Sequence, residues 1–296
     1  MPDETAPFSP DVRPSTPETA VLGQWIERAA SLDMLAAVPA SLRARLDPFV
    51  AREPGVVGYA LPGLPSTMLN RIFIGGEHGE RGERNEPSAE AVARVLERFA
   101  ARGAGSFFAH VASEAATPAV LAALRAHGVE RYPRAWLKLA RQPGLLPEPE
   151  LACELPLREA VLDDSAAFAQ LVIGCHGTAP AAEPVLAALV TRPRWHVYVA
   201  CDGSRPVATG ALMVLGDVGY LGFGATEPAY RRRGAQGALL AKRMRAAFAL
   251  GCRWVFSDTG EAVAGQANPS FDNMRRLGLL PIDRRDNYAP AGARWS

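Results

Sequence analysis

The sequence predicts an α/β protein with two tandem copies of one unit. Each copy is expected to hold a twisted, mostly antiparallel sheet with one parallel strand pair and flanking helices. Two observations predict this fold. The length of 296 residues suffices for two domains that each bury a core. The order loop, helix, strand, helix, glycine, strand also occurs once in each half, with Gly128 and Gly278 at matching positions. We interpret the repeat as an old internal duplication.

The first half begins with residues 1–19, an acidic, proline-rich segment without an apolar period that we expect to be a mobile tail. Apolar residues at helical spacing then predict a helix over 20–35. The elements expected next are a helical piece over 41–51, strands over 55–61 and 68–75, and a charged, glycine-rich surface loop over 75–87.

The repeated order starts after this loop. Ser88 and Thr117 are typical N-cap residues and begin the two helices of the first copy. The first domain is expected to cover residues 20–141, and a proline-rich segment predicts a linker over 142–152. The elements expected in this part are helices over 88–102 and 117–127 and strands over 107–111 and 129–140.

The second domain is expected over residues 153–296. Tight turns at 202–203 and 216–217 join three strands into an antiparallel meander. The third strand then passes through a helix to a parallel neighbour. Ligands of such sheets bind outside the carboxyl ends of the strands, where Thr226 and Asp258 lie. The expected elements are strands over 153–161, 195–201, 207–215, 218–226 and 254–258, helices over 165–173, 183–190, 235–250 and 269–277, and a last strand.

The loop between the strand over 218–226 and the helix over 235–250 is suited to bind a diphosphate. The first turn of a helix has N–H groups without internal partners and the positive end of the helix dipole. Gly234 and Gly237 let a ligand oxygen approach the backbone, while Arg231, Arg232 and Arg233 supply charge and forked donors.

Two familiar phosphate-binding loops do not match this stretch. A Walker loop needs Lys followed by Ser or Thr after its last glycine, but Ala238 and Leu239 follow Gly237. A dinucleotide-binding fingerprint that starts at Gly222 needs glycine or alanine where Glu227 stands.

The run from Arg231 to Gln236, Arg-Arg-Arg-Gly-Ala-Gln, resembles the acyl-CoA loop of the GNAT acyltransferase superfamily, Arg/Gln-x-x-Gly-x-Gly/Ala. Gln236 departs from the last position of that pattern. The order of elements over 153–295 is similar to a whole GNAT domain, and the first half resembles a degenerate copy. The alternative is a solvated, arginine-rich loop that only starts a helix.

The resemblance implies acetyl-CoA as co-substrate and assigns most of the binding residues. The backbone of Ala225 and Thr226 would meet the acyl carbonyl and the pantetheine arm. Asn268 resembles the pantetheine-contacting asparagine of the family, displaced by one position, and its alternative role is an N-cap before Pro269. The residues that the resemblance places at the pyrophosphate are Arg231, Arg232, Arg233, Gly234, Ala235, Gln236 and Gly237.

Catalytic candidates follow from the chemistry of thioester aminolysis, which needs a neutral amine and therefore a base or a water chain. Glu227 and Asp258 are the carboxylates best placed at the strand ends, with a solvated or capping role as the alternative for each. The usual general acid of the family is a tyrosine, but Met274 stands at that position. Tyr220, Tyr230 and Tyr288 are possible substitutes and are otherwise packing or rim residues. His176 and His196 are weaker candidates for the base.

The composition limits the classes of partner that this protein is expected to bind. The net charge of +1 gives no basic field that would attract nucleic acid or anionic lipid. The sequence contains no run of about 18 uncharged apolar residues, so we expect no membrane span, and the N-terminus is unlike a signal peptide. The four cysteines form no C-x-x-C pair, so we expect no disulfide scaffold and no metal site. Reduced thiols predict a cytoplasmic protein, and two lysines among 32 basic residues suggest GC-rich, bacterial coding.

The sequence thus predicts an acyl-CoA-dependent N-acyltransferase that moves an acetyl group to a primary amine by direct attack. The alternative is a non-catalytic CoA-binding sensor or interaction module, and a third possibility is a nucleotide-binding protein. The first copy carries Glu80, Glu83 and Glu86 where a diphosphate would lie, so it is expected not to bind one. We expect it to pack against the second copy as an internal pseudo-dimer and to shape the substrate entrance, or only to stabilise the chain.

Overall fold

The computed structural model describes residues 19–75, 86–144, 151–262 and 267–293. Three parts of the predictions lie outside the described residues: residues 1–18 of the expected tail, residues 76–85 of the expected surface loop, with Glu80 and Glu83, and residues 145–150 of the expected linker. The chain divides into two compact units, the first formed by Met1–Trp136 with Arg284–Ser296 and the second by Leu137–Asp283. Among the described residues, no helix is both long enough and apolar enough to cross a membrane.

The first unit contains a four-strand run in the order β1-β2-β3-β4. The first three strands are antiparallel, and β4 is parallel to β3 because α3 connects them. Its helices and strands are α1 (Thr19–Ala36), α2 (Ala40–Leu46), β1 (Phe49–Glu53), β2 (Val56–Ala60), β3 (Arg71–Ile74), α3 (Ala89–Ala101), β4 (Phe108–Val111), α4 (Pro118–Ala126) and β5 (Val129–Arg131).

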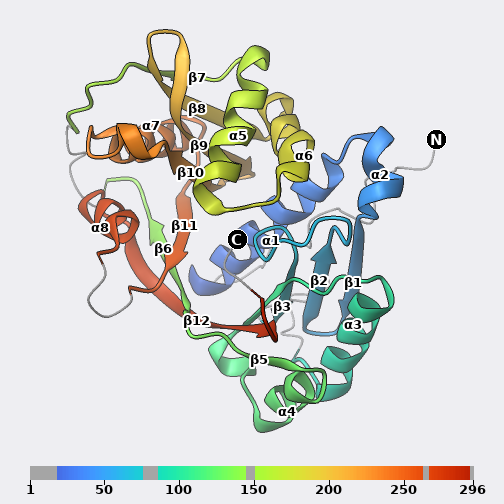
Figure 1. The fold of residues 1–296 in the computed structure, drawn as a ribbon. Helices are drawn as coiled ribbons and strands as arrows, with labels where there is room; N and C mark the ends of the chain where they lie inside the picture. Colours follow the sequence, from blue (N-terminus) through green and yellow to red (C-terminus); the bar gives the residue numbers. More distant parts are fainter. Residues whose placement is uncertain (1–18, 76–85, 145–150, 263–266, 294–296) are drawn as a thin grey trace. The chain divides into compact units, whose positions relative to one another are not determined.

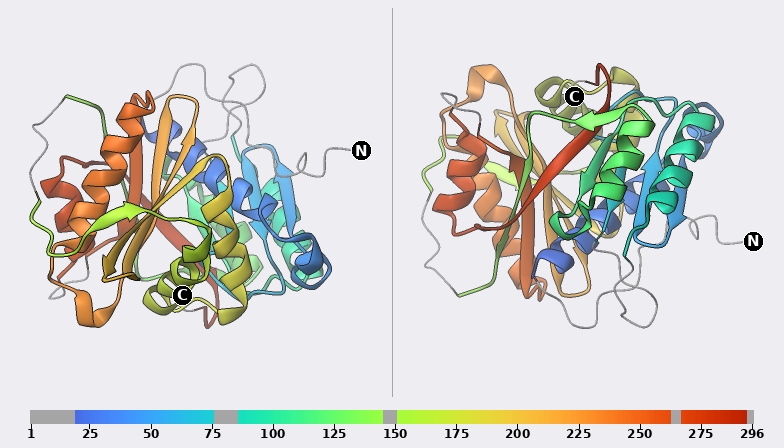
Figure 2. Two further views of the ribbon diagram at one scale, coloured as in Figure 1. Left: turned by 90° about the horizontal axis from the view of Figure 1, so that it is seen from above. Right: turned by 90° about the horizontal axis from the view of Figure 1, so that it is seen from below.

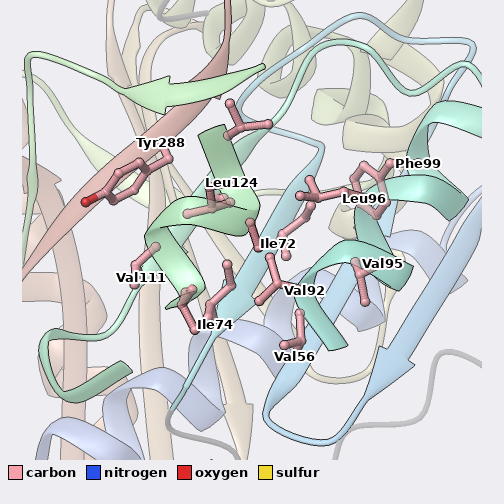
Figure 3. Close-up of a cluster of buried hydrophobic side chains, with 14 of the residues drawn as sticks. Val56, Ile72, Ile74, Val92, Val95, Leu96, Phe99, Val111, Leu124 and Tyr288 are labelled. Carbon is pink, nitrogen blue, oxygen red and sulfur yellow. The ribbon is translucent and has the colours of Figure 1, made fainter. Parts of the chain in front are cut away.

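Helix α3 covers the core of the first unit (Figure 3). Its apolar residues Val92, Val95, Leu96 and Phe99 recur at helical spacing and are buried in one cluster with residues of β2, β3 and β4. The Ser88 side chain accepts a hydrogen bond from the N–H of Ala91 at 3.1 Å and so caps the helix as predicted.

Two expected elements of the first half are wrong in their extent. The helical piece over 41–51 ends at Leu46, because Asp47 has a left-handed backbone with φ 49° and Pro48 follows it. The strand over 129–140 is two strands, β5 and β6 (Trp136–Arg141). Pro133 lies between them and has no N–H to donate to a neighbouring strand.

The second unit is a mixed sheet with helices on both sides. Figure 2 shows α7 and α8 on one side of its strands and α5 and α6 on the other. Glycines with positive φ, Gly203 and Gly216, form the tight turns of the predicted meander. The elements are β7 (Leu157–Glu159), α5 (Ser165–His176), α6 (Glu183–Ala187), β8 (Trp195–Asp202), β9 (Arg205–Leu215), β10 (Val218–Thr226), α7 (Ala235–Ala249), β11 (Trp254–Gly260), α8 (Pro269–Arg276) and β12 (Leu280–Pro290).

Strands β6 and β12 do not stay with the halves of the sequence that supply them. Within the second unit, β6 stands next to β11. The end of β12 belongs to the first unit, where Tyr288 is in register with Ala109 of β4 and Arg131 of β5. Tyr288 is buried in the core under α3 and α4. Each compact unit is therefore completed by a strand from the other half of the chain.

Candidate functional site

Strand β10 leaves its parallel neighbour before it ends. Its register with β11 runs from Val218 to Leu221, opposite Trp254 to Ser257. The register with β9 shifts between Gly222 and Ala225, and Phe223 has φ 53°. This irregularity is a β-bulge. Both strands continue beyond the register, to Thr226 and Gly260, so the sheet opens at their carboxyl ends.

A buried arginine on α7 holds the bulge. Arg243 is 2% exposed, and its Nη1 donates to the carbonyls of Ala211 at 3.0 Å and Gly222 at 2.9 Å. Its Nε donates to the carbonyl of Leu239 at 3.1 Å. Burial lowers the pKa of Arg243 to about 10, so the guanidinium stays charged at neutral pH. Gly210 makes room for it, because a Cβ there would lie 2.5 Å from the guanidinium carbon.

The loop after β10 leads directly into α7. Gly234 has φ 80°, and no side chain caps the helix at this position. Ser88 and Asn268, by contrast, cap α3 and α8 with their side chains. A Cβ on Gly234 would lie 2.0 Å from the carbonyl oxygen of Ala152, so only glycine fits. The first turn of α7 therefore keeps its N–H groups available to a ligand.

A cleft of about 1310 Å³ lies over this loop, within the second unit. It is lined by residues 151–154, the last residues of α5, the end of β10, the loop and first turn of α7, and one face of α8. The predicted coenzyme residues that line it are Ala225, Thr226, Arg231, Arg232, Arg233, Gly234, Ala235, Gln236 and Gly237.

The charge of the cleft is mainly positive. The loop arginines are exposed, and Arg231 donates from Nε to the carbonyl of Thr226 at 3.4 Å. Arg233 lies 3.9 Å from the carboxylate of Glu154 and stacks over the ring of Tyr230 at 5.1 Å. The carboxylate is itself largely exposed, so solvent screens this pair.

Sequence reasoning missed the contribution of α8. Pro269, Asp272, Asn273 and Arg276 all line the cleft. Their spacing of three and four residues places them on one helical face, and this spacing was the signal that could have found them. Arg276 adds a fourth guanidinium to the three of the loop.

Gln236, which departs from the family pattern, has a structural partner. Its side-chain oxygen accepts a hydrogen bond from Nδ2 of Asn273 at 2.8 Å. The oxygen of Asn273 in turn accepts from Nη1 of Arg276 at 3.0 Å. The Gln236 side chain is thus tied to α8, and its substitution for glycine or alanine leaves the backbone of the first turn in place.

Asn268 does not line the cleft. Its Oδ1 accepts from the N–H of Phe271 at 3.2 Å, and its Nδ2 donates to the carbonyl of Gly260 at 2.7 Å. Both ends of the amide are therefore bonded within the chain, and the residue caps α8.

Removing this cap should affect stability and leave coenzyme binding unchanged. We expect Asn268→Ala to lower the free energy of unfolding by about 1 kcal/mol, because the N–H of Phe271 loses its acceptor. Asn268→Ser should restore part of the loss, because serine also caps helices. Urea denaturation measures the first quantity and calorimetric titration with CoA the second. A CoA affinity reduced tenfold by both variants would return Asn268 to the binding residues.

Tyr220 and Asp258, two of the predicted catalytic residues, lie together. The hydroxyl of Tyr220 donates to Oδ1 of Asp258 at 3.1 Å, and Nζ of Lys138 lies 2.9 Å from Oδ2. Leu221 and Val255 are in the core cluster of α7. Tyr220 is one position before Leu221 and Asp258 three positions after Val255, so the alternation of side chains along a strand places both on the opposite face of the sheet. Lys138 comes from β6, and no sequence signal joined it to this site.

Glu227 does not line the cleft. Its carboxylate forms an ion pair with Arg205 at 2.6 Å, and Arg205 stacks over the ring of Tyr230 at 5.4 Å. The hydroxyl of Tyr230 donates to Asp202 at 2.6 Å. Met274, at the position of the family tyrosine, is 5% exposed and packs in the core under α7.

His176 takes a larger part in the site than the sequence suggested. It is the last residue of α5, it lines the cleft, and its Nε2 lies 3.1 Å from the carbonyl oxygen of Gly224 in the bulge. Burial lowers the pKa of His176, while the bond to Gly224 and the charge of Asp258 oppose that shift. Its neighbour Cys175 donates from Sγ to the carbonyl of Thr226 at 3.3 Å. Within the described ranges, no three His, Cys, Asp or Glu side chains gather as a metal ligand set would require.

Residues 166–262 match the family model of an acetyltransferase (GNAT) domain. The matched segment lies within the second unit and runs from α5 to just beyond β11. This segment of the second unit is therefore similar to a GNAT acetyltransferase domain, in agreement with the resemblance seen in the loop. No curated protein matches the sequence.

Solved structures of GNAT proteins share the fold over most of the chain. A GCN5-related N-acetyltransferase from Kribbella flavida is 22% identical with a TM-score of 0.59, and the match covers 88% of this chain and 96% of that one. A GCN5-related N-acetyltransferase from Sphaerobacter thermophilus is 15% identical with a TM-score of 0.56, and the match covers 82% of this chain and 79% of that one. A tandem GNAT protein from the clavulanic acid biosynthesis pathway is 16% identical with a TM-score of 0.51, and the match covers 83% of each chain. The predicted tandem fold is confirmed.

Proposed function

We propose that the second unit is an acyl-CoA-dependent N-acyltransferase. Its simplest reaction moves an acetyl group from acetyl-CoA to a primary amine by direct attack, without a covalent enzyme intermediate. The observation that carries the proposal is the arginine-glycine loop that opens α7 at the end of a strand released from its parallel neighbour.

The geometry supports a long, anionic ligand. The uncapped first turn of α7 and the guanidinium groups around it suit a diphosphate. The cleft of about 1310 Å³ is larger than the roughly 300–1,000 Å³ of ordinary small-molecule sites, which agrees with an extended ligand. We place the acyl end at the bulge, next to the backbone of Ala225 and Thr226.

The acceptor amine would enter on the sheet face that carries Tyr220 and Asp258. The Asp258 carboxylate there is held in place by the Tyr220 hydroxyl and by Lys138, and its remaining lone pairs can accept a hydrogen bond from the amine. We leave Glu227 out of this role because Arg205 binds its carboxylate away from the cleft.

Binding of acetyl-CoA tests the proposal. At 100 times the dissociation constant, linkage predicts that acetyl-CoA raises the free energy of unfolding by about 2.7 kcal/mol. Arg231→Glu should weaken CoA binding at least tenfold in a calorimetric titration, because it replaces a guanidinium of the cleft with a carboxylate. Arg253→Glu is the matched control, since this exposed arginine precedes β11 at the opposite end of the parallel pair. Equal affinities of the two variants would remove the loop from the proposal.

The buried Met274 favours one second candidate, a CoA-binding sensor without catalysis, because no tyrosine stands at the position of the usual acid. Incubating the protein with acetyl-CoA and a panel of primary amines while measuring free thiol separates the two functions. Turnover of any amine excludes the sensor, and CoA binding without turnover favours it.

A further inference from the structure

We infer that His176 is the general base of the second unit, and that its Nδ1 takes the proton from the attacking amine. The inference rests on the proposed acyl transfer and assigns the proton transfer to a residue that lines the cleft, which Glu227 and Asp258 do not. Its basis is the position of the imidazole between the end of α5 and the bulge of β10, at the wall of the cleft.

The bulge fixes which ring nitrogen is available. A carbonyl oxygen only accepts, so Nε2 of His176 carries the hydrogen in its contact with Gly224. In the neutral ring, Nδ1 then holds the lone pair. Among the residues that the structure describes, none forms a hydrogen bond with Nδ1 of His176. This atom is also not among the fully buried side-chain atoms that lack a partner, so it is accessible from outside. The lone pair is therefore open to an N–H of the attacking amine or to an O–H of a bound water.

The surroundings keep the imidazole neutral at the pH where it must act. Burial lowers the pKa of His176, whereas Asp258 of β11, itself paired with Lys138 of β6, opposes the shift. Cys175, its neighbour on α5, donates from Sγ to the carbonyl of Thr226. Arg231 lines the same cleft from the loop. An imidazole with a pKa below its ordinary value of about 6.5 is neutral at pH 7 and able to accept a proton.

The step balances without another reactant. The amine nitrogen attacks the thioester carbonyl carbon, and a C–N bond forms while the C–S bond breaks. The proton leaves the amine nitrogen for Nδ1 of His176 and passes from the imidazolium to solvent. The CoA thiolate leaves and takes a proton from solvent, so the products are an amide and free CoA.

The variant His176→Gln removes the proposed base and keeps a donor for the hydrogen bond to Gly224. The glutamine amide can donate to the Gly224 carbonyl as Nε2 does, but it accepts no proton. With acetyl-CoA and a panel of spermidine, L-lysine, tyramine and a peptide with a free N-terminus, we expect kcat to fall about 10²–10⁴-fold. The KM for acetyl-CoA should stay within about threefold, and added imidazole should restore part of the rate.

The pH profile gives the signature of a base. Wild-type kcat/KM should show an acid limb at a pH lower than the ordinary imidazole pKa of about 6.5, because burial lowers the pKa at which His176 becomes protonated, and the Gln variant should lose this limb. His196→Gln is the control, since His196 lies on β8 beside Glu159, outside the cleft, and should keep the wild-type profile.

A measurement that needs no amine substrate completes the test. Nitrogen-15 NMR of histidine-labelled full-length protein should show His176 neutral at pH 7 with its hydrogen on Nε2. A hydrogen on Nδ1, or a charged ring, overturns the inference. If the wild-type protein acetylates an amine and His176→Gln does so at the same rate, the assignment of the base is wrong while the proposed function stands. A wild-type protein that binds acetyl-CoA and acetylates none of the amines overturns the assignment together with the catalytic part of the proposed function.

Discussion

Gly234→Ala is expected to weaken CoA binding at least tenfold and to lower the free energy of unfolding by about 2–5 kcal/mol. The new Cβ would lie 2.0 Å from the carbonyl oxygen of Ala152, which belongs to the backbone and cannot rotate away. Alanine also resists the left-handed conformation at φ 80°, at a cost of about 1–2 kcal/mol, and overpacking adds about 1–3 kcal/mol. The loop must shift, and the first turn of α7 shifts with it.

Gly251→Ala separates the two causes. Gly251 has φ 88° at the other end of α7, and a Cβ there would meet nothing within 4 Å. This variant should show only the conformational cost of about 1–2 kcal/mol and wild-type affinity for CoA. Urea denaturation and calorimetric titration measure both quantities. Wild-type CoA affinity in the Gly234 variant would show that the ligand does not use this turn.

Arg243→Met is expected to lower the free energy of unfolding by about 2–6 kcal/mol and to reduce acetyl transfer even where the protein remains folded. The carbonyls of Ala211 and Gly222 lose their donor, and each buried, unbonded group costs about 1–3 kcal/mol. The bulge also loses the contact that holds it open next to the acyl end of the cleft.

Lys242→Met is the matched control for the loss of a positive charge on α7. Lys242 is exposed, and its ammonium lies 6.0 Å from the centre of the Tyr198 ring. We expect its stability to change by less than about 1 kcal/mol. Circular dichroism shows whether each variant is folded before the kinetics of acetyl transfer are measured. If both methionine variants lost the same stability, the hydrogen bonds of Arg243 would not support the bulge.

The sequence by itself determined where most of the helices begin and where the arginine-glycine loop lies, because these signals are local. Ser88 and Thr117 begin helices at the predicted positions, since a cap depends on bonds within one turn. The run from Arg231 to Gly237 lines one cleft because seven consecutive residues between a strand and a helix have little freedom to separate.

Only the tertiary structure decided which distant residues complete the site. Lys138 reaches Asp258 because β6 joins the second unit, and strand partners are set by long-range burial that no local pattern records. The same cause sends the end of β12 to the first unit, where burial of Tyr288 completes its core. His176 looked weak in sequence because the carbonyl that orients its ring lies 48 positions away, in a bulge stabilised by a buried arginine.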